Sequence, residues 1–221
     1  MNMKNKMKVF SLVLMTVVLC LLGAGLAFAD IMYNVNINTS SISGMLGNLD
    51  FTFAGGIPVP PAGTVTISNF ISDGILGIGQ VAGGASGSLA TQVMINNTPG
   101  YNDFFTPFTF GASLAFNLNF SGPAVDTPDP KSGGSTFAFS MLDNGDPPNP
   151  LLSNDPFGFA FSVDLNNDGS AAVSNFMDLA VGTISLVPPG PAVPEPATLG
   201  LMALAIAAMG LFLFRRNGES S

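Results

Sequence analysis

The chain has 221 residues and a formal net charge of −8, without histidine or tryptophan and with Cys20 as its single cysteine. Between residues 30 and 192, twelve aspartates accompany one basic residue, Lys131, so this stretch carries a formal charge of about −11. These counts exclude an internal disulfide, a Cys/His metal site and a histidine-dependent catalytic centre, and the negative charge disfavours nucleic acid as a partner.

The first 29 residues have the layout of a secretory signal peptide. Three lysines within the first eight residues precede an apolar stretch over residues 9–22. Ala27-Phe28-Ala29 then offers the small-x-small pattern that signal peptidase cleaves, which predicts export through the Sec translocon and a mature protein that starts at Asp30. A lipoprotein anchored through Cys20 is the alternative, but a lipidated cysteine normally follows a small residue and here it follows leucine.

Residues 30–186 are predicted to form one domain of short strands. Apolar residues alternate with Asn, Ser, Thr, Gly, Ala or Asp in period two, as in strands that are buried on one face. Turn-forming residues separate these runs, and no sustained helical period occurs. The pattern predicts an all-β, antiparallel β-sandwich or jelly-roll-like domain. The alternating positions are Tyr33-Val35-Ile37, Leu49-Phe51-Phe53, Val65-Ile67, Leu89-Val93-Ile95, Leu114-Phe116-Leu118-Phe120, Phe137-Phe139-Met141 and Phe157-Phe159-Phe161-Val163-Leu165.

The 19 phenylalanines are predicted to lie mostly in the core, because their alternation matches the pleat of a strand. The aromatic residues within 101–110 are the exception, since they are irregularly spaced and follow Pro99-Gly100. We interpret this segment as a loop before a strand. Tyr101 and Phe105 are therefore candidates for a ligand site in which aromatic rings stack on sugars.

A second candidate site is the segment from Asp164 to Gly169. In a calcium loop, oxygens at positions one, three and five converge on the ion and glycine at position six permits the turn, and Asp164, Asn166, Asp168 and Gly169 occupy these places. Position twelve is Asn175 instead of the bidentate glutamate, so the EF-hand pattern is incomplete. The segment predicts either a weak calcium site or an ordinary hairpin turn.

Catalysis finds little support in the residues. Lys131 is the only side chain available as a base for a serine nucleophile, and it lies in a segment rich in Gly, Ser and Pro. Most aspartates lie in turn sequences, where local hydrogen bonding favours them. We therefore expect a protein that is not an enzyme, with a hydrolase built on paired carboxylates as the remote alternative.

The C-terminal end predicts a membrane anchor. A linker over residues 187–196 ends in Pro194-Glu195-Pro196, and an uncharged apolar run follows from Ala197 to Phe214. As a helix this run would span about 27 Å, which is close to the thickness of a bilayer core. Arg215 and Arg216 come next, and the preference of such residues for the cytoplasm places residues 215–221 inside and the β domain outside.

These three parts together resemble the PEP-CTERM sorting signal, which occurs in exported proteins of Gram-negative bacteria that make extracellular polysaccharide. In that family the membrane-embedded cysteine protease or transpeptidase exosortase reads the Pro-Glu-Pro motif and is thought to cleave near it. The resemblance implies that Pro194, Glu195 and Pro196, with Arg215 and Arg216 as the stop, direct sorting. An ordinary C-terminal anchor is the alternative. Segments 33–53, 87–120 and 164–166 also look like a group of uncharacterised PEP-CTERM proteins, which implies no activity.

The sequence thus predicts a membrane-anchored precursor that is delivered to the cell surface or the extracellular space. Its expected role is structural or adhesive, in association with exopolysaccharide or biofilm. A calcium-assisted glycan-binding module is the first alternative and a hydrolase the second.

Overall fold

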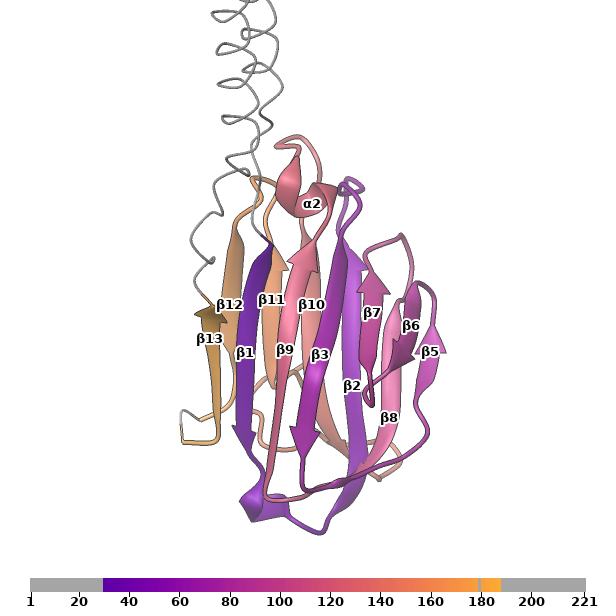
Figure 1. The fold of residues 1–221 in the computed structure, drawn as a ribbon, viewed down its shortest axis with the longest axis vertical. Coiled ribbons are helices and arrows are strands. Elements are labelled where there is room, and N and C mark those ends of the chain that lie inside the picture. Colours follow the sequence, from indigo (N-terminus) through magenta and orange to yellow (C-terminus); the bar gives the residue numbers. More distant parts are fainter. Residues whose placement is uncertain (1–29, 179, 188–221) are drawn as a thin grey trace, which may run out of the picture. The chain divides into compact units, whose positions relative to one another are not determined.

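The computed structural model describes residues 30–178 and 180–187, which form two packed antiparallel sheets (Figure 1). The strands of sheet A follow the order β13-β1-β9-β3-β7-β6, and those of sheet B the order β12-β11-β10-β2-β8-β4, with β5 also paired to β8. The predicted all-β, antiparallel, two-sheet architecture is therefore confirmed. The predicted signal peptide, residues 1–29, and anchor helix, residues 197–214, lie outside the described residues.

The elements have the following bounds. Sheet A contains β1 (Ile31–Asn38), β3 (Thr64–Ser72), β6 (Ala85–Ser88), β7 (Gln92–Asn96), β9 (Ser113–Ser121) and β13 (Gly182–Val187). Sheet B contains β2 (Leu46–Gly55), β4 (Ile75–Leu76), β5 (Gln80–Ala82), β8 (Asp103–Thr109), β10 (Ser135–Asp143), β11 (Phe161–Leu165) and β12 (Ala171–Asn175). The short helices are the 3₁₀ turn Ser40–Ile42 and α2 (Pro123–Asp126), and no helix in the described part of the chain is long and apolar enough to cross a membrane.

The core between the sheets is built largely from phenylalanine. Phe116 of β9 packs against two rings of sheet B, with ring centroids 5.5 Å from Phe51 and 5.3 Å from Phe139. All three side chains are buried, as the period-two pattern predicts. Edge-to-face and tilted ring pairs of this kind add to the free energy gained by burying their apolar surface.

Two predicted strand assignments are wrong. The run from Phe157 to Leu165 forms a strand only from Phe161, and Phe157 is 81% exposed. The reason is a turn in which the Asp155 carboxylate accepts hydrogen bonds from the backbone N–H groups of Phe157 and Phe159, at 3.0 and 3.1 Å. Leu89, predicted as part of a strand with Val93, instead lies in the turn between β6 and β7, where its side chain is still buried.

The prediction of a loop over residues 101–110 is also wrong, because most of this segment forms strand β8. Phe104, Phe108 and Phe110 are buried in the core. Strand β8 pairs with β2 on one side and with the short strands β4 and β5 on the other. The segment therefore contributes one face to the core and leaves only its other face for a ligand.

Candidate functional site

The predicted sorting and cleavage residues Ala27, Ala29, Pro194, Glu195, Pro196, Arg215 and Arg216 lie outside the described residues. Asp30, the predicted first residue of the mature protein, is described, and its carboxylate accepts a hydrogen bond of 2.9 Å from the Asn119 side chain. The candidate sites that the structure can position are therefore on the β domain.

The strands of sheet A contain no charged residue, although the carboxylates of Asp30 and Asp73, from segments outside these strands, bind Asn119, Ala112 and Ser113 at the border of the sheet. The segment that includes these six strands nevertheless has a formal charge of about −11. Asn36 of β1 lies opposite Thr183 of β13 and Ala115 of β9, and Asn34 lies opposite Ser185 and Asn117. We call the outward-facing polar residues of these strands the amide–hydroxyl face. On β1, β3, β9 and β13 they are Asn34, Asn36, Asn38, Thr64, Thr66, Ser68, Ser113, Asn117, Asn119, Ser121, Thr183 and Ser185.

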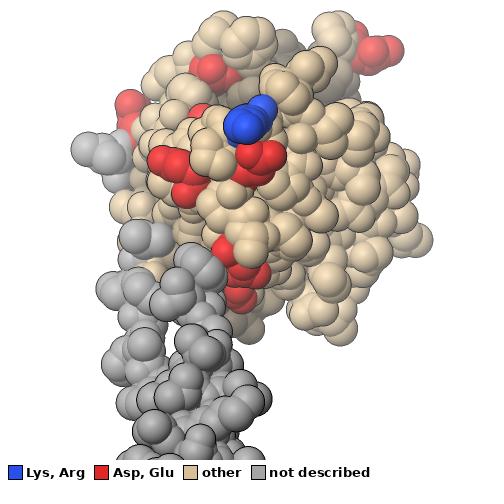
Figure 2. Space-filling view, turned by 90° about the horizontal axis from the view of Figure 1, so that it is seen from above, with Lys and Arg blue, Asp and Glu red and all other residues tan. Residues whose placement is uncertain are grey.

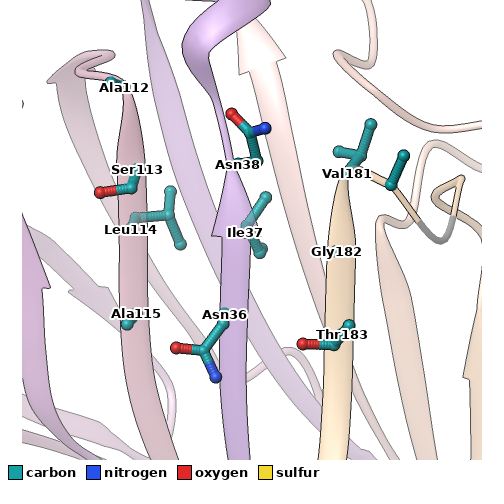
Figure 3. A pocket seen from close by; sticks show the side chains of 11 residues that line it. Asn36, Ile37, Asn38, Ala112, Ser113, Leu114, Ala115, Val181, Gly182 and Thr183 are labelled. Atoms are coloured by element: carbon teal, nitrogen blue, oxygen red, sulfur yellow. The ribbon is translucent and has the colours of Figure 1, made fainter.

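An open hollow of about 410 Å³ lies on this face, across β9, β1 and β13. Figure 3 shows Asn36 and Asn38 from β1, Ser113 from β9 and Thr183 from β13 around it. These side chains offer amide and hydroxyl groups, each able to donate and accept hydrogen bonds. The hollow also has apolar residues in its lining, such as Ile37, Leu114 and Val181, so it suits a neutral ligand that presents both hydroxyl groups and apolar surface.

The other charged residues of the domain lie in the loops, in α2 and in sheet B. Figure 2 shows acidic side chains scattered over one end of the domain, around a single basic side chain and between large uncharged areas. In sheet B, four aspartates lie within strands, namely Asp50, Asp103, Asp143 and Asp164. The two sheets thus differ in electrostatic character.

The outer face of sheet B holds a pair of close carboxyl groups, Asp50 of β2 and Asp103 of β8. Asp103 is directly opposite Thr52, two residues from Asp50, and the two carboxyl groups lie within hydrogen-bonding reach of each other. Asp103 is only 8% exposed, and one oxygen of each carboxyl group is buried without a protein hydrogen-bond donor. Two ionised carboxylates this close repel each other. A proton on one of them removes the repulsion and forms a hydrogen bond between the two groups.

Burial, together with the hydrogen bond and the charge of Asp103, raises the pKa of Asp50 to about 8. The pair therefore holds a proton to a higher pH than an ordinary aspartate does. Burial and the negative charges of Asp50 and Asp103 likewise raise the pKa of the Tyr101 hydroxyl to about 12. The Tyr101 hydroxyl therefore keeps its proton near neutrality.

Tyr101 and Phe105, the predicted ligand residues, lie beside this acidic pair. Phe105 is directly opposite Asp50 in the β2–β8 pairing, so both side chains are on the outer face of sheet B. The Tyr101 hydroxyl is within reach of the Asp103 carboxylate, while the Tyr101 side chain as a whole is 65% exposed. We call Asp50, Asp103, Tyr101 and Phe105 the acidic–aromatic site.

The predicted calcium segment forms the hairpin turn between β11 and β12. Asp164 accepts a hydrogen bond of 2.6 Å from Thr136, and the Asn166 side chain donates one of 3.0 Å to the Ser170 hydroxyl. Asp168 accepts bonds from the Ser170 N–H and hydroxyl groups, at 2.9 and 2.6 Å, and these bonds lower its pKa. Asp168 thus stabilises the backbone of the turn, while Asp164 is engaged by a side chain of the neighbouring strand β10.

No cluster of three or more Asp, Glu, His or Cys side chains in the described part of the chain is placed to hold a metal ion. Calcium binding at Asp164, Asn166 and Asp168 stays a prediction.

The sequence interpretation missed Asp50 and Asp103. The available signal was an aspartate on the polar face of a strand, as in Leu49-Asp50-Phe51, without the turn residues that surround most other aspartates of the chain. That signal marks an unusual residue but not its partner, which lies about fifty positions away in sequence.

Comparison with family models finds the PEP-CTERM protein-sorting motif at residues 192–217. No curated protein and no solved structure matches the chain. The chain thus carries this sorting motif, as its resemblance implied, and the motif indicates an exported protein that is sorted and processed through the exosortase system. The motif covers the C-terminal end alone and leaves the role of the β domain to be inferred from its surfaces.

Proposed function

We propose that the chain is a non-enzymatic structural or adhesive component of the cell surface or extracellular matrix, and that its amide–hydroxyl face contacts neutral polysaccharide. The observation that supports this proposal is the absence of charged residues from all six strands of sheet A, in a domain that is otherwise strongly acidic. The sorting motif supports delivery to the compartment in which such polymers occur.

The chemistry of the face suits sugars. Amide and hydroxyl side chains both donate and accept, so they can match the hydroxyl groups of a polysaccharide in several orientations. A neutral polymer meets no repulsion on this face, whereas the negative charge of the domain disfavours an anionic one. Each contact is weak, but a repeating polymer that engages several domains at once gains affinity through multivalency.

The proposal is tested by adding one charge to the face. Asn36→Asp changes an exposed amide beside the hollow into a carboxylate of the same size. We expect the full chain, purified in detergent, to bind the neutral exopolysaccharide of its host in a pull-down assay and the variant to bind it several-fold more weakly. Asn144→Asp adds the same charge in the loop after β10 and is the matched control. Equal binding by both variants and the unchanged chain would refute the role of this face.

A second candidate is a glycan site at the acidic–aromatic site. The exposure of Tyr101 beside two carboxyl groups favours it, because sugar recognition combines a stacking ring with polar groups that bind hydroxyls. Tyr101→Ala should then weaken polysaccharide binding, while Phe157→Ala, which removes another exposed ring, should not. Loss of binding with Asn36→Asp but not with Tyr101→Ala would assign binding to sheet A alone.

A further inference from the structure

Asp50 and Asp103 have no positive partner on their strands, and the hydrogen-bonding neighbours of their carboxyl groups are each other and the Tyr101 hydroxyl. One oxygen of each carboxyl group is buried and has no protein donor, and Asp103 is 8% exposed. Lys131 is the only basic residue among those that the structure describes, and it lies in the loop before β10 and not on β2 or β8. A proton on the pair removes one charge near neutrality, and a cation that displaced this proton would compensate both carboxylates and their unpartnered oxygens.

Further oxygen-bearing side chains surround the pair. Thr52 lies directly opposite Asp103 in the β2–β8 pairing, and Ser140 lies directly opposite Asp50 in the β10–β2 pairing. Because residues that are directly opposite share a face of the sheet, both hydroxyls are on the same outer face as the carboxyl groups. The Tyr101 hydroxyl approaches from the start of β8. The site thus gathers oxygen atoms and offers no nitrogen or sulfur ligand from these five residues.

A set of oxygen atoms around two carboxylates is the chemistry of a hard divalent cation. Calcium takes about six to eight oxygen ligands in flexible geometry, including carboxylates, protein oxygens and water, whereas magnesium demands a near-ideal octahedron. Strands β2, β8 and β10 fix the backbone positions of four of these residues, so the site is held by the sheet and not by a mobile loop. Calcium fits an irregular site of this kind better than magnesium does.

We propose that Asp50 and Asp103 form a calcium site on the outer face of sheet B, with Thr52, Ser140 and Tyr101 as neighbouring oxygens that bind the ion or its water. This site differs from the hairpin at Asp164, where Thr136 of β10 already binds the Asp164 carboxylate and Ser170 already binds that of Asp168. It also differs from the amide–hydroxyl face, so the failure of either proposal leaves the other standing.

Terbium luminescence tests the proposal, because Tb³⁺ replaces calcium and its emission is sensitised by a tyrosine close to the ion. The chain has two tyrosines and no tryptophan, and Tyr33 is buried in the core at 4% exposure. We expect the full chain in detergent, freed of metal with a chelator, to give saturable emission that excess calcium abolishes. Calcium alone should raise the melting temperature.

Three variants locate the ion. Asp103→Asn should weaken the apparent affinity at least about tenfold, since even changes outside the ligand shell cost this much at metal sites. Tyr101→Phe should remove the emission while leaving the rise in melting temperature, and Asp164→Asn should change neither. Circular dichroism checks that each variant folds, and Asp50→Asn serves in place of Asp103→Asn if that variant does not.

The proposal is overturned by the absence of saturable emission together with the absence of a calcium effect on melting. It is equally overturned if Asp164→Asn abolishes binding and Asp103→Asn does not, or if emission survives Tyr101→Phe.

Discussion

Substitution of Asp50 by asparagine should stabilise the domain at neutral pH. In the unfolded chain Asp50 ionises near the ordinary Asp pKa of about 3.9, whereas in the folded domain burial and Asp103 raise that pKa to about 8. At pH 7 the folded state therefore retains a proton that the unfolded chain releases. One pKa unit corresponds to about 1.4 kcal/mol, so retention of this proton lowers the free energy of unfolding by about 4 kcal/mol at pH 7.

The sign of the pH dependence follows from the same values. The stabilising effect of the protonated Asp50 is fully present below about pH 4 and is lost as the pH rises towards 8. Asp50→Asn removes the titration, and its amide can still donate a hydrogen bond to Asp103. We expect the variant to gain roughly 2–4 kcal/mol over the unchanged chain at pH 7 and little at pH 4.

Urea unfolding of the full chain in detergent, at several values between pH 4 and pH 8 and without calcium, measures this difference. Taking the difference between variant and unchanged chain cancels the titration of the other aspartates. Asp73→Asn provides a control, because backbone N–H groups of Ala112 and Ser113 lower the pKa of Asp73. This variant should lose stability by a nearly constant amount from pH 4 to pH 8, and the loss should shrink only below about pH 4. A difference for Asp50→Asn that is constant from pH 4 to pH 8 would refute the reasoning.

Two other predictions concern the core and the sorting motif. Phe116→Ala should lower the free energy of unfolding by about 3–5 kcal/mol, because it leaves a cavity among the rings that link the two sheets, while Phe157→Ala should change it by less than about 0.5 kcal/mol. Glu195→Ala, with Pro194 and Pro196 also changed to alanine, should leave a precursor of full C-terminal mass in the inner membrane, as in cells without exosortase. Mass spectrometry of fractionated cells measures this, and normal processing of the triple variant would contradict it.

Strands with regular alternation of apolar and polar residues, and one buried face, were predicted correctly from the sequence. In β9, Leu114, Phe116, Leu118 and Phe120 alternate with small or polar residues, and all four are buried. The strands β4, β5 and β6 were not predicted, because they are two to four residues long and lie in a glycine-rich stretch with little alternation. Strands β4 and β5 pair with β8, and β6 pairs with β7. These pairings stabilise the short strands, although their own sequences have little preference for strand structure.

The errors at aromatic residues have a similar cause. Phe104 and Phe105 are adjacent, so one must face away from the core, and this broke the pattern that identifies a strand. At Phe157 the alternation was present, but the Asp155 carboxylate binds the backbone N–H groups that a strand would need. At Phe104 and Phe105 an outward-facing ring interrupts the alternation within a real strand. At Phe157 a carboxylate prevents a strand although the alternation is present.

The candidate ligand residues were predicted more completely than their partners. Tyr101 and Phe105 stood out as aromatic residues that do not fit the core, and one is exposed while the other faces outward. Asp50 could not be joined to them, because its contact with Asp103 depends on the register between β2 and β8. A register set by core packing on the opposite face of both strands is not visible in either strand alone.

The separation of charge between the two sheets gives the domain two surfaces that can be changed independently. A carboxylate added to a strand of sheet A alters a set of strands that has no other charge, so its effect on a neutral ligand can be assigned to that position. Removal of a carboxylate from sheet B acts on a pair that is largely shielded from solvent, so its effect appears in stability and in cation binding. The sorting motif at residues 192–217 is separate from both in sequence. Failure of processing would therefore refute the matrix role without affecting either surface, and failure of either surface would leave sorting intact.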